Sequence, residues 1–102
     1  MSTPLLLALL LGPSLAQAYP QPVRPAKLGL CVACHGVDGR SRAPGTPHIN
    51  GQDRVYLQRA LTDYRSGARK SNPMSAIAGT LQPRDIEQMA AWYSAQPGFT
   101  AP

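Results

Sequence analysis

Both cysteines of the chain fall in one Cys-x-x-Cys-His pentapeptide, residues 31–35. A redox-active dithiol would need only Cys31 and Cys34, at a helix start within a βαβ pattern. No alternating apolar and polar run predicts the strands of such a pattern. A zinc site could combine the cysteines with a histidine, and His48 is the only histidine besides His35. Joint coordination of one tetrahedral ion by the adjacent Cys34 and His35 is awkward, which disfavours zinc.

Covalent haem attachment uses every position of the pentapeptide. Two cysteines three residues apart lie about one helical turn from each other, so their sulfurs can reach the two vinyl groups of one porphyrin. The next residue, His35, then projects its imidazole over the ring, where it can bind iron. The pentapeptide therefore favours haem c, held covalently by Cys31 and Cys34 with His35 as an iron ligand.

Helical patterns surround the pentapeptide and must position it. A short helix is predicted over 26–34, a second from Asp53 to Gly67, and a third from Pro83 to the Pro97-Gly98 pair. The third carries a buried stripe at helical spacing, made of Ile86, Met89, Ala90 and Tyr93. Residues 36–51 and 67–81 are expected to be long irregular loops, and a long loop in a small domain often wraps a functional group. The sequence predicts an all-α fold of about three helices.

The chain has 102 residues, with 11 prolines and a hydrophobic content of 43%, so it holds at most one domain. Residues 5–11 are continuously apolar, and Ala16-Gln17-Ala18 forms a small-x-small site. This pattern predicts a signal peptide over 1–18 that is cleaved after Ala18, because the apolar run is far shorter than the roughly 20 residues that cross a bilayer. Residues 19–25 contain three prolines and are expected to be an extended lead-in to a domain over 26–102.

The formal net charge of +5 comes from ten basic and five acidic residues. By itself it would suit an acidic protein partner or a nucleic acid. Export and a haem group favour the acidic protein partner. Six cations are expected to contact haem propionates, steer a partner, or simply face solvent: Arg40, Arg42, Arg54, Arg65, Arg69 and Lys70.

Four segments in order resemble one known family. Residues 31–39 resemble the haem motif of bacterial class I c-type cytochromes. Residues 47–52 resemble the Pro-x-Leu-x-Gly-Gln segment of cytochrome c4 and other small periplasmic cytochromes, and residues 64–69 continue the match. Residues 85–93 resemble the closing helix of the family. The likeness runs from about residue 28 to residue 96.

The resemblance implies a cytochrome c fold wrapped around one covalent haem c, with its iron between His35 and Met74. It also implies that the carbonyl of Pro47 accepts a hydrogen bond from His35 and orients the imidazole. His48 is the rival ligand, but it follows Pro47 and would lie on the wrong face of the ring.

The function implied by the resemblance is electron transfer between periplasmic redox proteins, with no enzymatic activity and no membrane span. Two alternatives stay open: a haem subunit of a dehydrogenase or sulfur-oxidising complex, and a ligand-binding haem sensor or peroxidase. The second would apply if Met74 left the iron.

The sequence departs from the family at two places outside the predicted iron ligands. The helix before the haem motif is short, so only Leu28 and Leu30 are expected to meet Ala90, Ala91 and Trp92 of the closing helix. Gln82 stands where the family has a Ser or Thr helix cap, which predicts a weaker cap.

Overall fold

The computed structural model describes residues 2–4 and 22–98. Within these residues the chain is all-helical and has no strand, which confirms the predicted fold class. Residues 1 and 5–18 of the predicted signal peptide and residues 19–21 of the predicted lead-in lie outside the described residues, so the boundaries of both segments stay predictions. Residues 22–25 of the lead-in are described and have no regular secondary structure.

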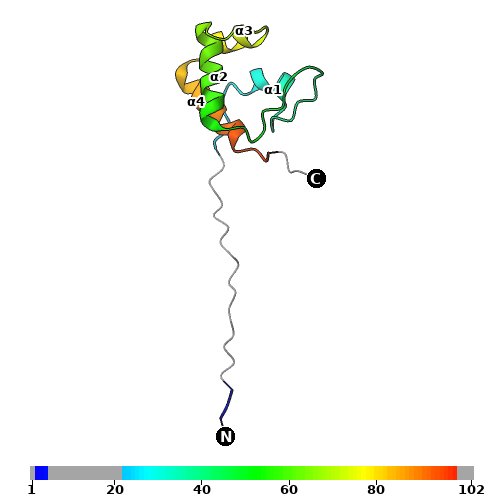
Figure 1. Ribbon diagram of the computed structural model, residues 1–102, viewed down its shortest axis with the longest axis vertical. Coiled ribbons are helices and arrows are strands. Elements are labelled where there is room, and N and C mark those ends of the chain that lie inside the picture. The colour runs from blue at the N-terminus through cyan, green and yellow to red at the C-terminus, as the bar shows by residue number, and fades with distance from the viewer. Residues whose placement is uncertain (1, 5–21, 99–102) are drawn as a thin grey trace.

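The described residues form four helices, which Figure 1 labels α1 (Gly29–His35), α2 (Arg54–Ser66), α3 (Met74–Gly79) and α4 (Pro83–Ser94). The longest helix, α2, packs against both α3 and α4. The long connection over 36–51 contains no regular secondary structure, as expected, and it links α1 to α2.

Helix α2 begins and ends where its sequence predicts. The carboxylate of Asp53 accepts a hydrogen bond from the backbone N–H of Tyr56 at 2.8 Å, which satisfies one free donor of the first turn. At the other end Gly67 adopts a φ of 85°, the left-handed conformation that commonly ends a helix.

Helix α4 also begins as predicted, with Pro83 in its first turn. The carboxylate of Asp85 reaches back and accepts the backbone N–H of Gln82 at 2.8 Å, so Asp85 supports the cap that was expected to be weak. The helix ends at Ser94, earlier than the predicted Pro97-Gly98 pair.

Helix α3 was not predicted, because the whole stretch 67–81 was expected to be irregular. It has only six residues and no capping side chain, so its sequence carries too little periodicity to reveal a helix. Ala78 is fully buried in it, and the helix packs on α2. Packing rather than intrinsic propensity stabilises a helix this short.

Helix α1 begins later than predicted. Residues 26–28 form a turn, and the helix runs from Gly29 to His35. Leu28, just before it, is fully buried and belongs to the same cluster as Ala90 and Trp92, as expected. The expectation for Leu30 was wrong: it is 47% exposed, because residues two positions apart point to nearly opposite sides of a helical segment, so Leu30 faces away from the side that Leu28 buries.

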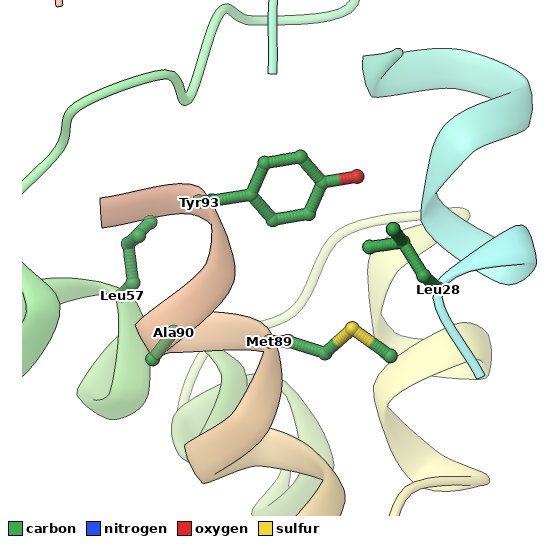
Figure 2. Close-up of a cluster of buried hydrophobic side chains, with 5 residues drawn as sticks. All are labelled: Leu28, Leu57, Met89, Ala90 and Tyr93. Atoms are coloured by element: carbon green, nitrogen blue, oxygen red, sulfur yellow. The ribbon is translucent and has the colours of Figure 1, made fainter. Parts of the chain in front are cut away.

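The core lies where α2, α4 and the chain before α1 meet. In Figure 2, Met89, Ala90 and Tyr93 of α4 lie between Leu57 of α2 and Leu28. The predicted stripe on α4 is confirmed, since Ile86, Met89, Ala90 and Tyr93 are all buried. Among the described residues, five buried side chains form this cluster, and Ala78, Leu81 and Ile86 are buried outside it.

Candidate functional site

Helix α1 brings both cysteines and His35 to the wall of one cavity. The cavity has a volume of about 180 Å³, and Met74 lines it from the start of α3. The remaining lining comes from α1, the loop after it, α2 and the α3 region: Leu30, Gly45, Thr46, Pro47, Tyr64, Ser71, Asn72, Pro73 and Ile77. The side chains of Cys31, Cys34, His35 and Met74 are therefore gathered around one space, although Met74 follows His35 by 39 positions in the sequence.

A second, smaller cavity of about 70 Å³ adjoins the first on the core side. It shares Cys31, His35 and Met74 with the first cavity, and the rest of its lining comes from Ile49, Leu57, Ala60, Leu61, Met89 and Tyr93. The two cavities are thus parts of one crevice with mostly apolar walls. Such walls, with two thiols, an imidazole and a thioether in them, suit a large apolar ring that carries a metal.

The imidazole of His35 is held in one orientation. Its side chain is buried, and Nδ1 lies 2.9 Å from the carbonyl oxygen of Pro47. Because a carbonyl can only accept, Nδ1 must carry the hydrogen, which leaves the lone pair of Nε2 free for a metal. The arrangement therefore fixes both the tautomer and the plane of a metal-binding imidazole.

His48 lies on the surface and lines neither cavity. Its Nδ1 accepts a hydrogen bond from the backbone N–H of Ser41 at 2.9 Å. The hydroxyl of Ser41 in turn donates to the carbonyl of Cys34 at 3.0 Å, so these residues hold the loop against α1. The structure thus gives His48 a role in the loop.

Two alternatives for the cysteines find no support in the geometry. Among the described residues, no three His, Cys, Asp or Glu side chains come together as a metal site, so the zinc set is not assembled. Burial raises the pKa of the Cys31 thiol to about 11. A redox-active dithiol needs a lowered thiol pKa, so this environment is the opposite of an activating one.

Two neighbouring residues of α4 hold the backbone that follows the pentapeptide. The hydroxyl of Tyr93 donates to the carbonyl of Gly36 at 2.9 Å, and Nε1 of Trp92 donates to the carbonyl of Val37 at 2.7 Å. Gly39 is packed so closely that a Cβ there would lie 2.6 Å from the backbone nitrogen of Asn50. These contacts attach the pentapeptide segment to the last helix.

Met89 was assigned to the buried stripe of the last helix by its spacing alone, and Tyr64 was not singled out. Tyr64 faces the first cavity, and Met89 faces the second with its sulfur 3.9 Å from Sγ of Cys31. Helical periodicity shows which side of a helix is buried. It does not show whether that side meets other side chains or a cavity, so neither residue could have been placed at the site beforehand.

The cytochrome c family model matches residues 26–96. This chain belongs to the cytochrome c family. It is therefore a c-type cytochrome, an electron-transfer protein that carries covalently bound haem c with its iron. The Cys-x-x-Cys-His motif and the apolar crevice beside it fit this cofactor.

Individual c-type cytochromes are also similar to this chain in sequence and in structure. Cytochrome c-554(548) of Halomonas halodenitrificans is 44% identical over 73 residues, which cover 69% of this chain and 88% of the relative. Cytochrome c4 of Stutzerimonas stutzeri is 38% identical over 81 residues, covering 71% of this chain but only 39% of the relative. The structure of Acidithiobacillus ferrooxidans cytochrome c4 superposes with a TM-score of 0.60 at 32% identity, over 64% of this chain and 37% of that protein.

The chain thus spans most of the length of cytochrome c-554(548), but well under half of the length of the two c4 cytochromes. No helix among the described residues is both long and apolar enough to cross a membrane. A cytochrome of this kind exchanges electrons with redox partners.

Proposed function

We propose that this cytochrome carries single electrons, with His35 and Met74 as the two axial ligands of the haem iron and Cys31 and Cys34 as its covalent anchors. The observation that supports this assignment is that Cys31, His35 and Met74 line both parts of the same crevice. Haem c bound in this way supplies a one-electron ferric/ferrous couple.

The chain's own groups set the properties of that couple. The thioether of Met74 is a soft ligand, and the apolar walls lower the dielectric around the iron, so both favour the ferrous state. The carbonyl of Pro47, 2.9 Å from Nδ1 of His35, fixes the imidazole and raises its basicity. The haem environment therefore needs little rearrangement when an electron arrives or leaves.

The same ligand set argues against an enzyme. Oxygen or peroxide chemistry at haem needs an open coordination position. With one axial position held by His35 and the other by Met74, the chain itself fills both. We therefore propose a carrier with no substrate other than the electron.

We also propose that the carrier works in the periplasm after removal of residues 1–18, and that it docks to redox proteins with acidic surfaces. The apolar run over 5–11, the small-x-small site ending at Ala18 and the net charge of +5 support this proposal. None of the residues 1–18 carries a charged side chain, so the whole charge stays with the exported part.

The test uses the haem-loaded protein from a host that matures c-type cytochromes. A Met–Fe(III) charge-transfer band and a low-spin spectrum are expected for the oxidised protein, with haem that resists acid-acetone extraction. A high-spin ferric spectrum would contradict the carrier assignment and favour a ligand-binding sensor or peroxidase. Mass spectrometry of the exported protein checks whether it begins at Tyr19.

A further inference from the structure

The segment that carries Met74 has little internal support. Met74 is the first residue of α3, which has only six residues and no capping side chain. A helix this short does not hold its shape by its own hydrogen bonds. The position of the Met74 sulfur therefore depends on what attaches the flanks of this segment to the rest of the fold.

Arg69 attaches the flank that precedes Met74. Its backbone N–H donates to the carbonyl of Asp63 in α2 at 3.1 Å. Its guanidinium lies over the ring of Tyr64, 4.7 Å from the centroid, which is the geometry of a cation–π contact. Tyr64 also lines the cavity that Met74 faces, so Arg69 links the loop before Met74 to the wall of the site.

Arg65 attaches the flank that follows α3. Its Nε donates to the carbonyl of Leu81 at 2.7 Å, and the side chain of Leu81 is 1% exposed. Leu81 lies in the short link between α3 and α4, and a hydrogen bond from a charged donor to its carbonyl is a strong one. Both arginines come from the same end of α2, one in its last turn and one just beyond Gly67.

We propose that Arg65 and Arg69 are positioning residues for the Met74 sulfur. The two arginines fix the flanks of the Met74 segment to α2 and so disfavour dissociation of Met74 from the iron. This inference rests on the proposed role of Met74 as an iron ligand. It assigns two of the chain's exposed cations to the support of the site, where they would set how readily an outside ligand replaces Met74.

The experiment measures the dissociation constant of imidazole for the oxidised, haem-loaded protein, because imidazole can bind the iron only after Met74 has left. The variants are Arg65→Gln and Arg69→Gln. Arg59→Gln is the matched control, since Arg59 is an exposed arginine of the same helix and its replacement removes the same charge. Each Gln variant of the pair is expected to bind imidazole about tenfold more tightly than the wild type, as loss of a charge-assisted contact predicts.

The imidazole affinity of the Arg59→Gln control is expected to stay within about twofold of the wild type, because this variant removes a charge without removing a contact to the Met74 segment. Equal affinity in wild type, Arg65→Gln and Arg69→Gln would overturn the proposal. So would an increase of the same size in Arg59→Gln, because it would show a general effect of charge. If a Gln variant does not accumulate with haem, the Lys variants are used, and affinities between those of wild type and Met74→Ala are expected.

Met74→Ala separates this inference from the function on which it rests. If Met74→Ala binds imidazole no more tightly than wild type, Met74 is not the displaced ligand and the proposed ligation fails. If it binds far more tightly, the ligation holds, and Arg65→Gln or Arg69→Gln added to Met74→Ala should change the affinity by less than about twofold. A further increase in that background would show that the arginines act on the pocket in general, and it would overturn their positioning role.

Discussion

Nδ1 of His35 lies 2.9 Å from the carbonyl oxygen of Pro47, which joins the end of α1 to the loop that follows it. The acceptor is a backbone atom, so the contact depends on the path of the loop rather than on a side chain. The hydroxyl of Ser41 supports that path through its bond to the carbonyl of Cys34. The orientation of the imidazole is therefore a property of the whole loop over 36–51.

His35→Ala is expected to impair haem incorporation itself, because it removes the proposed proximal iron ligand next to the covalent anchors. His48→Ala is the comparison variant, since it removes the other imidazole of the described residues, which bonds to the backbone of Ser41 in the loop but lines neither cavity. The yield of haem-loaded protein, measured by haem staining of equal amounts of chain, should fall sharply for His35→Ala and clearly less for His48→Ala, which affects the loop but removes no proposed iron ligand. A larger loss of haem-loaded protein for His48→Ala than for His35→Ala would contradict the assignment of His35 as an iron ligand.

Met74→Ala is expected to keep its haem, because Cys31 and Cys34 remain. It should lose the Met–Fe(III) charge-transfer band and show a lower reduction potential, since a soft ligand that favours ferrous iron is gone. Absorption spectroscopy checks the loss of the band, and redox titration checks the reduction potential. Met89→Leu is the control for the loss of a thioether, because Met89 also lines the crevice but is not the proposed ligand, and Leu preserves its bulk; this variant should keep the charge-transfer band. A wild-type spectrum for Met74→Ala would exclude Met74 as the ligand.

Gly39→Ala is expected to destabilise the fold by about 1–3 kcal/mol, the range for a strained or overpacked position. Gly39 has a φ of +83°, and a Cβ there would lie 2.6 Å from the nitrogen of Asn50 and 3.0 Å from Cδ1 of Tyr93. Gly45→Ala is the control, with a similar φ of +78° but no atom within 4 Å of the added Cβ. Denaturant unfolding should show the larger loss for Gly39→Ala, and equal losses would show that backbone strain alone accounts for the cost.

Asp85→Asn is expected to lower the free energy of unfolding at neutral pH. The hydrogen bond from Lys27, then that from the backbone of Gln82, holds the pKa of Asp85 below its ordinary value of 3.8. A carboxyl group whose pKa is lower in the folded state stabilises the fold above its unfolded pKa, and this contribution is lost as pH falls through the folded pKa. The stability difference between wild type and variant should therefore be constant above about pH 3.8 and shrink below it.

Lys27→Met distinguishes the two interactions of Asp85. It removes the ion pair, in which Nζ lies 2.8 Å from the carboxylate, and it leaves the bond from Gln82 in place. A smaller loss than that of Asp85→Asn is expected, because exposed ion pairs contribute little by themselves. If Lys27→Met cost as much as Asp85→Asn, the support that Asp85 gives to the helix start would be negligible.

The elements with strong local determinants could be predicted from the sequence. Asp53 and Gly67 mark the ends of α2, and Pro83 marks the start of α4, because capping depends on residues within one turn of the helix end. The all-helical class and the buried stripe of α4 follow from periodicity. The pentapeptide indicated the cofactor because its spacing has few other uses.

Features that depend on distant contacts could not be predicted. Helix α3 forms because residues 74–79 pack on α2. Leu30 lines the crevice because Leu28, two positions before it, is the residue that packs on α4. The links from Arg65 to Leu81 and from Asp85 to Lys27 also require the folded chain. A carbonyl or an ammonium as partner leaves no pattern in the sequence that would reveal it.

The bonds from Trp92 and Tyr93 to Val37 and Gly36 join groups that are 55 and 57 residues apart. They cannot form until α4 has been synthesised. A chain cut short before Pro83 would keep both cysteines and His35 but would leave that segment without its attachment to the last helix. The attachment of the haem-motif segment therefore depends on residues that follow it by more than fifty positions, since only a chain that extends through Tyr93 can form both bonds.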